Sequence, residues 1–190
     1  MTLYMPLGTN CKPSQWLRDK NLRKAAYPLD WVVCPMTSSI TLIENDFDDF
    51  LNYQNLIYLP PRRRYLFNEG TEVFREDVVT PVICTKYNIL FPHDFSVEGS
   101  KDYKTVKDKY NRRIERFIKI KDSRTDFHFI YELSELNEWQ RTCYEEANTS
   151  FNHLNELTLI KMLNHFKEYK FMSLETLKHD LTCMEDNIND

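Results

Sequence analysis

Apolar residues recur at two different spacings along the chain and predict an alternation of strands and helices. A short apolar run at residues 3–7 ends at the turn-forming residues 8–10, and a helical spacing begins at Pro13 and continues through Trp16. A strand, a tight turn and a helix are the simplest structure for this order. Proline fits the first helical turn, where its missing N–H group needs no partner. Cys11 is therefore expected at the N-terminal end of this helix.

The same spacings predict the remaining elements. Strands are expected at residues 29–33, in two or three segments between residues 72 and 95, and at residues 127–133, and helices at residues 39–51, 103–121, 139–147, 151–166 and 174–184. The helix at residues 39–51 has acidic side chains opposite its apolar face, and the helix at residues 103–121 has basic ones. An acidic end at residues 185–190 is expected to fray. Together these elements predict a mixed α/β (α+β) fold.

Composition and charge exclude several classes of protein. The 190 residues are 42% hydrophobic and include only three glycines, as in one folded domain and unlike a disordered or collagen-like chain. The formal net charge is −4, so no overall positive field attracts a nucleic acid or an anionic membrane. The longest apolar runs fall far short of the roughly 20 residues that span a bilayer. We therefore expect neither a nucleic-acid partner nor a membrane partner.

The cysteines indicate a reducing compartment. They are odd in number, widely spaced and without a Cys-x-x-Cys pair: Cys11, Cys34, Cys84, Cys143 and Cys183. This pattern argues against a disulfide framework and a tetrathiolate zinc site. The N-terminus has no basic residue before its apolar run and does not resemble a signal peptide. A cytoplasmic protein, or one exported without a classical signal peptide, is expected.

Motifs for metals and nucleotides are missing from the sequence. There is no His-Glu-x-x-His, no Cys-x-x-Cys and no acidic loop with a glycine hinge, so no metal is predicted. Three glycines cannot form a glycine-rich phosphate loop. No cofactor is therefore predicted.

The tetrapeptide at residues 8–11, Gly-Thr-Asn-Cys, is the most informative segment for chemistry. A thiol at a helix N-terminus faces unpaired N–H groups and the positive end of the helix dipole, which lower its pKa and favour the nucleophilic thiolate. Gly8 permits a sharp turn, and Asn10 can donate to an oxyanion together with the Cys11 N–H. The alternative is that Cys11 is a small apolar residue at a helix start and Asn10 an ordinary cap.

A cysteine nucleophile needs a base, and His93 is the first candidate among the five histidines. It lies at the end of an apolar strand between two aromatic residues that exclude water, and Asp94 can fix the tautomer of its imidazole. The alternative is a turn residue after Pro92, with Asp94 capping the next segment. His128, on a predicted strand, is the second candidate, and the other three lie on predicted helix faces.

Several short blocks resemble one known family. They are Leu-Gly-Thr-Asn-Cys at residues 7–11, Asn-Leu-Arg-Lys at 21–24, Tyr-Pro-Leu-Asp-Trp at 27–31, Phe-Pro-His-Asp-Phe at 91–95, and Tyr-Asn-Arg-Arg-Ile-Glu-Arg-Phe at 110–117. In this order they are similar to the bacterial and viral papain-like cysteine peptidases of a once uncharacterised domain family. The resemblance covers roughly residues 3–133, and several motifs in order are far more specific than any one of them.

The resemblance implies a role for each matching residue. It makes Cys11 the nucleophile and His93 the base, and it makes Asp30 and Asp94 candidates for orienting or shaping the site. The sequence has Leu29 where the family prefers Phe, and alanines where a serine is common, which are changes in packing more than in chemistry. The implied fold is a papain-like core at residues 1–134, with a small sheet and an active-site helix. Residues 135–190 are expected to form a helical extension packed on that core.

The implied function is thiol-dependent acyl transfer on an unknown protein, peptide or acyl substrate. A hydrolase, either a cysteine peptidase or an amidase, is the first expectation. An acyltransferase that uses an acyl thioester is the alternative, because a related group of capsule-associated acetyltransferases has a similar predicted fold. A non-enzymatic protein-interaction module is the third possibility. For the enzyme we expect the Cys11 Sγ within about 3 to 5 Å of a His93 ring nitrogen in the unliganded protein.

Three charged groups have a structural alternative. Asp30 beside a tryptophan is also typical of a turn-capping residue. The arginines at residues 62–64 follow two prolines and can bind a phosphate or an acidic partner, but a solvated loop is the favoured expectation. The basic face formed by Arg112, Arg113 and Arg116 can contact a phosphate or coenzyme pyrophosphate, or can pair with the acidic residues 46–49.

Overall fold

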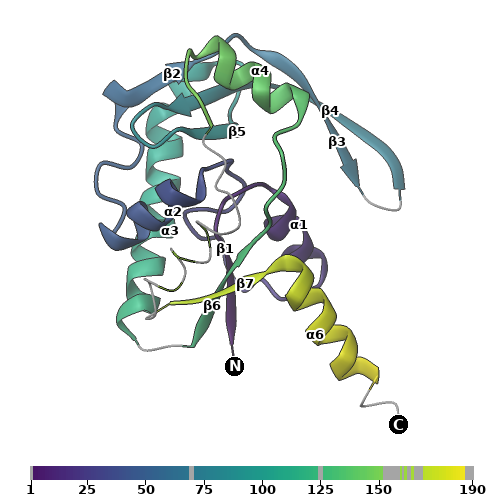
Figure 1. Ribbon diagram of the computed structural model, residues 1–190. Coiled ribbons are helices and arrows are strands. Elements are labelled where there is room, and N and C mark those ends of the chain that lie inside the picture. The colour runs from purple at the N-terminus through teal and green to yellow at the C-terminus, as the bar shows by residue number, and fades with distance from the viewer. Residues whose placement is uncertain are drawn as a thin grey trace.

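Two small sheets lie at different levels of the molecule, with helices around both (Figure 1). The computed structural model describes residues 2–68, 71–123, 126–151, 159, 161, 164 and 169–186. Its mixture of helices and small sheets confirms the predicted α+β class.

The first sheet is parallel and leads directly into the Cys11 turn. Its strands, in the order β1-β6-β7, are β1 (Leu3–Pro6), β6 (Phe127–Tyr131) and β7 (Lys170–Ser173). Helix α1 (Lys12–Asp19) follows β1, and helix α6 (Leu174–Asp186) follows β7. Leu17 of α1 packs with Ile130 of β6 and Leu177 of α6 in one buried cluster. Because parallel strands end at the same edge, the turn after β1 lies beside the end of β6.

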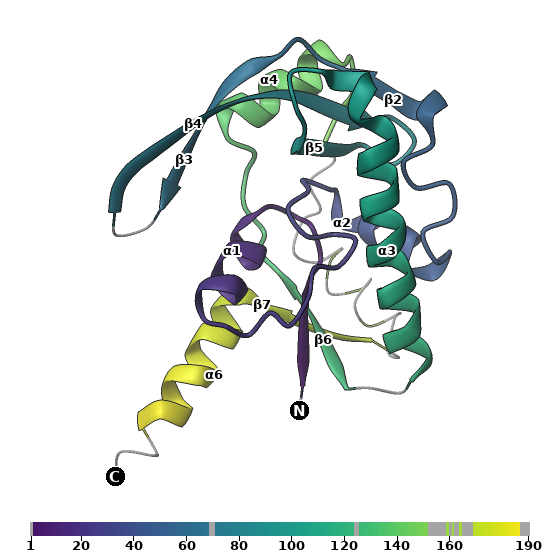
Figure 2. The same cartoon turned by 180° about the vertical axis from the view of Figure 1, so that it is seen from behind.

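The second sheet is antiparallel and is organised around one long strand. Strand β4 (Thr71–Cys84) pairs with β2 (Leu56–Tyr58), β3 (Arg62–Asn68) and β5 (Ile89–Phe95). Figures 1 and 2 show that β3 and the first part of β4 form a ribbon that extends away from the body. The second part of β4 pairs with β2 and β5 inside the body. Strand β5 contains the candidate base His93.

An aromatic core joins the second sheet to the helices. The remaining helices are α2 (Met36–Glu44), α3 (Tyr103–Asp122), α4 (Glu138–Glu146) and the short 3-10 helices Tyr53–Asn55 and Gly99–Asp102. Phe91 of β5 lies 5.5 Å from Tyr110 of α3 and 5.8 Å from Phe50, measured between ring centroids. All three side chains are buried. The core therefore fixes β5 against α3.

Most of the predicted elements are confirmed near their expected bounds. They are the strands now called β1, β4, β5 and β6 and the helices α1, α3, α4 and α6. The predicted helix at residues 151–166 lies mostly outside the described residues, as do the last residues of the acidic end. Within the described part of the chain, no helix is long and apolar enough to cross a membrane.

Two predicted elements differ from the structure. Residues 29–33 are not a strand: Trp31 has a φ of 66°, and only Val33 forms a bridge, to Leu90 of β5. Helix α2 begins at Met36 and ends at Glu44, before the turns that contain Phe47 and Leu51. Both segments are apolar because they are buried, and burial alone does not distinguish a strand or helix from a packed turn.

Three strands were not predicted from the sequence, β2, β3 and β7. Strand β3 includes the arginines that were expected in a solvated loop, and Arg62 forms an ion pair with Glu146 of α4. Strand β7 lies beyond residue 134 and pairs with β6, so the later part of the chain completes the first sheet. The division at residue 134 stays a prediction, and the segment after it is not purely helical.

Candidate active site

Cys11 lies where the sequence places it, at the N-terminal end of α1. It is the N-cap residue, with its side chain half-buried, and its carbonyl oxygen accepts a hydrogen bond from the Gln15 N–H at 3.0 Å. Pro13 lies in the first turn, as expected. The thiol is therefore beside the positive end of the helix dipole.

The preceding turn is held tightly against its neighbours. Gly8 has a φ of 78°, and a Cβ at this position would lie 3.0 Å from Val32 Cγ2. The Gly8 carbonyl accepts a hydrogen bond from the Cys34 N–H at 2.7 Å. On the other side, the Thr9 hydroxyl accepts one from the Glu132 N–H at 3.2 Å, just after β6. Only glycine fits this turn without strain.

Asn10 is engaged in shaping the same turn. Its amide nitrogen donates to the Glu132 carbonyl at 3.1 Å and to the Ser134 hydroxyl at 2.9 Å. Its amide oxygen accepts from the Lys12 N–H at 2.8 Å. Because both amide hydrogens are donated within the protein, an oxyanion role would require Asn10 to release one of them.

The candidate base His93 lies on β5 against Trp31. The two rings meet edge to face, with centroids 5.8 Å apart, and the imidazole Nδ1 is shielded from solvent. The backbone N–H of Trp31 donates to the Ser14 hydroxyl at 3.2 Å, in the first turn of α1. Trp31 thus contacts both His93 and the helix that begins after Cys11. The expected distance of about 3 to 5 Å between Cys11 and His93 stays a prediction.

The backbone at Trp31 is strained, and the loop around it is anchored on both sides. A non-glycine residue in the left-handed region costs about 1 to 3 kcal/mol. Val33 and Leu90 exchange two backbone hydrogen bonds of 2.8 and 2.9 Å, which join the loop to β5. The tertiary contacts therefore hold Trp31 in place against its own backbone preference.

Asp30 is fully buried and forms an ion pair inside the loop. Its carboxylate lies 3.0 Å from the Arg23 Nε and accepts a hydrogen bond from the Tyr27 N–H at 3.1 Å. Burial raises the pKa of Asp30 to about 6, and the Arg23 charge opposes this shift. These contacts stabilise the turn that leads to Trp31.

Asp94 is held by α3. Its carboxylate accepts a hydrogen bond from the Tyr110 hydroxyl at 2.9 Å and pairs with the Lys109 ammonium. Burial raises the pKa of Tyr110 well above 10, so its hydroxyl keeps the donated proton. Neighbouring residues of a strand point to opposite faces, which places Asp94 toward α3 and His93 toward Trp31. The structure therefore brings His93 to the loop and Asp94 to the helix.

His128, the second candidate base, lies in the first sheet. It pairs in register with Tyr4 of β1, and their rings meet edge to face with centroids 6.1 Å apart. Its contacts are therefore with β1, while those of His93 are with the loop.

Cys11 also differs from the other four cysteines, none of which forms a disulfide. Cys34, Cys84 and Cys143 are buried, and burial raises their thiol pKa values, to about 12 for Cys34 and about 11 for Cys143. Cys183 is exposed on α6. A half-buried thiol at a helix start is found at Cys11 alone among the five.

Sequence reasoning missed the contacts that Trp31 makes. The tryptophan belongs to a block quoted for the family resemblance, but nothing in its local pattern indicates an edge contact with His93 or a bond to Ser14. Arg23 was not singled out as the partner of Asp30 either. Arg23 and Asp30 are seven residues apart, and within an irregular loop this spacing does not indicate that the two side chains meet.

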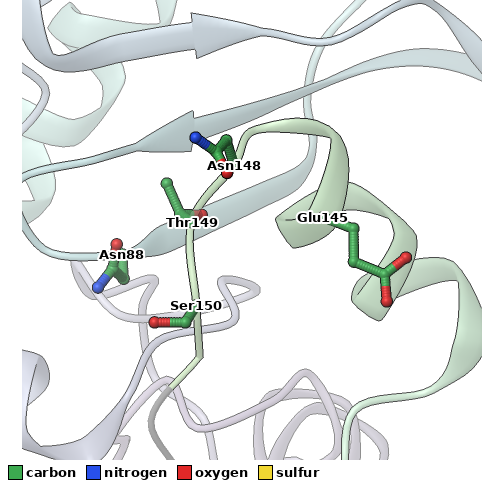
Figure 3. A pocket seen from close by; sticks show the side chains of 5 residues that line it. All are labelled: Asn88, Glu145, Asn148, Thr149 and Ser150. Atoms are coloured by element: carbon green, nitrogen blue, oxygen red, sulfur yellow. The ribbon is translucent and has the colours of Figure 1, made fainter.

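A separate hollow of about 610 Å3 lies between the β4–β5 turn and the end of α4 (Figure 3). Its lining is polar and consists of Asn88, Glu145, Asn148, Thr149 and Ser150. None of the candidate site residues lines it. Among the described residues, no group of three or more histidine, cysteine, aspartate or glutamate side chains is placed to bind a metal ion.

Comparisons with known proteins agree with the motif order. A sequence profile of the family described as "Putative papain-like cysteine peptidase (DUF1796)" matches residues 2–175. The chain is also similar to "Uncharacterized protein R408" of Acanthamoeba polyphaga mimivirus, with 30% identity over 151 residues that cover 76% of this chain and 68% of the relative. No solved structure matches the chain significantly. The matched region contains Cys11, the loop with Trp31, and His93.

Proposed function

Because the chain belongs to the papain-like cysteine peptidase family, we propose that it is a thiol hydrolase, a cysteine peptidase or amidase, with Cys11 as nucleophile and His93 as base. The observation that supports this most directly is Trp31, whose ring contacts His93 and whose backbone N–H bonds to Ser14 in the first turn of the Cys11 helix. The substrate is a protein, a peptide or another acyl compound.

The proposed reaction has two steps. In the first, the Cys11 thiol gives its proton to His93 and its sulfur attacks the substrate carbonyl carbon. A C–S bond forms, the C–N bond breaks, and His93 passes the proton to the leaving amine. In the second step His93 takes a proton from water, whose oxygen attacks the thioester carbon. The C–S bond breaks, the carboxylic acid is released, and His93 returns the proton to the Cys11 sulfur.

The helix start supplies the electrostatic support. The positive end of the α1 dipole stabilises the thiolate, and the Cys11 N–H is a donor for the oxyanion. Asp30 and Asp94 act as positioning residues in this proposal. Asp30 holds the loop through Arg23, and Asp94 holds β5 through Tyr110.

The chemistry needs a reduced thiol at Cys11. This requirement fits the cytoplasm, or export by a route that does not use a classical signal peptide.

Labelling with iodoacetamide near neutral pH tests the dyad. We expect Cys11 to react at least about tenfold faster than Cys183, the exposed reference thiol in the same chain. His93→Ala should abolish this difference, whereas the control His128→Ala should leave it intact. The rates are measured by mass spectrometry of the labelled peptides. If Cys11 reacts no faster than Cys183, the enzyme proposal is wrong and a protein-interaction module becomes the better explanation.

Intact-mass spectrometry distinguishes a hydrolase from an acyltransferase. A peptide-derived acyl group on Cys11 that is lost to water supports the hydrolase. Acylation only from a coenzyme thioester, with release only to an added amine or alcohol, would contradict hydrolysis and assign the site to acyl transfer.

A further inference from the structure

Two guanidinium groups lie over the same tryptophan that contacts His93. The Arg18 Cζ is 5.1 Å and the Arg23 Cζ is 5.7 Å from the centroid of the Trp31 ring. These are cation–π distances. Arg18 comes from the last turn of α1 and Arg23 from the following loop. The ring edge of His93 and two positive charges therefore converge on Trp31.

Both guanidinium groups have donors left for a ligand. Arg18 uses its Nε for Asp19, and Arg23 uses its Nε for Asp30 and the Ala25 carbonyl. Their terminal nitrogens have no hydrogen bond among the residues that the structure describes. A guanidinium has five N–H donors in a fixed fork, and the outer part of the fork matches a carboxylate or a phosphate. The side chain of Arg18 is 51% exposed and that of Arg23 is 15% exposed, so the forks are open to solvent to different degrees.

A third arginine, Arg113, adds positive charge near Asp30. The Nη1 of Arg113 is shielded from solvent and has no hydrogen-bond partner within the described chain. Its guanidinium lies 4.9 Å from the Tyr110 ring centroid, and its charge acts on Asp30.

The charge distribution points to the same region. Residues 12–26 include five basic residues and one acidic residue, although the whole chain has a formal charge of −4. Lys12, Arg18 and Arg23 are paired with Glu132, Asp19 and Asp30, so Lys20 and Lys24 give the local excess of positive charge. A local positive field in an acidic protein raises the concentration of anionic ligands at one place on its surface. This place is the helix that begins at Cys11 and the loop after it.

We propose that the substrate of the Cys11 site bears an anionic group, a carboxylate or a phosphate, which Arg18 and Arg23 bind beside Trp31. The proposal rests on the proposed thiol chemistry and names the substrate class for it. Stacking on the indole holds each fork before the ligand arrives, which lowers the ordering cost of binding. Arg18 and Arg23 are specificity-determining residues here, and the acyl chemistry belongs to Cys11 and His93.

The test uses activated esters that differ only in charge. The mono-4-nitrophenyl esters of succinic, glutaric and adipic acid are compared with the 4-nitrophenyl esters of butyric, valeric and hexanoic acid. The Cys11 sulfur attacks the ester carbonyl, the bond to the phenolic oxygen breaks, and 4-nitrophenolate leaves. Water then cleaves the thioester. The ratio of kcat/KM for the anionic ester to that for the neutral ester of equal length is the measured quantity.

We expect this ratio to exceed one and to be largest at one chain length. Arg18→Gln should lower the ratio about fivefold. Arg18→Lys should lower it less, because lysine keeps the positive charge but lacks the paired N–H donors of a guanidinium. Lys20→Gln is the matched control, since Lys20 is an exposed cation on the same segment that does not contact Trp31. Salt at about 0.5 M should lower the ratio in the parent protein by screening.

Competition identifies which anion is preferred. Inhibition by inorganic phosphate at concentrations where acetate has no effect assigns a phosphate group, and the reverse assigns a carboxylate. If Arg18→Gln changes the ratio no more than Lys20→Gln does, the inference is overturned while Cys11-dependent hydrolysis of the neutral esters still supports the proposed function. If Cys11→Ser releases nitrophenolate as fast as the parent protein with every ester, the proposed function fails, and this inference fails with it.

Discussion

The loop at residues 20–35 and strand β5 both contribute to the candidate site, but different forces hold them. The loop is irregular, with positive φ at Asn21 and Trp31, and besides its buried apolar side chains it contains a buried ion pair and a few hydrogen bonds. Strand β5 is regular, pairs with β4 and is covered by buried aromatic side chains. Both regions bury apolar side chains, but the loop adds a buried charge pair to an irregular backbone, whereas the backbone of β5 is held by sheet pairing.

Because of this difference, substitutions in the two regions should have different effects. Apolar burial and sheet pairing contribute much of the folding free energy, so β5 cannot change without loss of the fold. The loop includes the Arg23–Asp30 pair and the strained Trp31. Substitutions there should therefore alter the surroundings of His93 and the pH dependence of stability.

Removal of an aromatic ring from β5 should have the largest effect. Phe91→Ala should lower the free energy of unfolding by about 3 to 5 kcal/mol, because the buried ring leaves a cavity against Phe50 and Tyr110. Urea unfolding followed by circular dichroism measures it. A loss below about 1 kcal/mol would show that β5 is not anchored by the aromatic core.

Removal of one partner of the buried ion pair should be the next largest effect. Arg23→Met should destabilise the protein by about 3 kcal/mol, because Asp30 stays buried without its countercharge. Lys24→Met, at the exposed neighbouring position, is the control and should change stability by less than about 0.5 kcal/mol. The double variant Arg23→Met/Asp30→Leu should recover part of the loss. Equal effects of Arg23→Met and Lys24→Met would contradict the role of the pair.

The raised pKa of Asp30 predicts a specific pH dependence. The folded protein holds this proton up to about pH 6, whereas the unfolded chain releases it near pH 4. The Asp30 contribution is therefore fully present below about pH 4 and is lost as the pH rises through about 6, by roughly 2 to 3 kcal/mol. The stability of the parent protein relative to Asp30→Asn should fall over this interval. A difference that is constant from pH 4 to 7 would refute a raised pKa.

The close approach at Gly8 should have the smallest effect. Gly8 and Gly99 both have positive φ, but a Cβ at Gly8 lies 3.0 Å from Val32 Cγ2, while the nearest atom at Gly99 is 3.6 Å away. Gly8→Ala should therefore cost about 1 kcal/mol more than Gly99→Ala, since only the first also displaces a packed side chain. Thermal unfolding of the two variants gives the comparison. Equal losses would mean that Val32 moves aside freely.

The segment around Cys11 could be predicted from the sequence because its signals are local. A glycine in the turn, a proline in the first helical turn and an apolar spacing specify a strand, a turn and a helix within about 20 residues. The order of the motifs likewise identified the family, whose profile covers residues 2–175. The apolar, aromatic pattern of β5 and the basic amphipathic pattern of α3 likewise predicted these two elements.

The contacts of the charged residues could not be predicted, because they depend on distant parts of the chain. Asp94 adjoins His93 in sequence, yet the alternation of strand faces turns it toward Tyr110 of α3. Asn10 adjoins Cys11, yet its amide bonds to residues 132 and 134 after β6. Adjacency along the chain was therefore a poor guide to which side chains meet.

Local signals in the sequence were enough to predict the α+β class, the family, and the placement of Cys11 at a helix start. The tertiary structure decided that residues 29–33 form a strained turn and not a strand, that β7 joins the first sheet, and that Trp31 lies between His93 and two arginines. The physical reason is the range of the interactions. Turn and helix signals act over a few residues, whereas burial, countercharges and ring contacts depend on which distant segments the whole fold brings together.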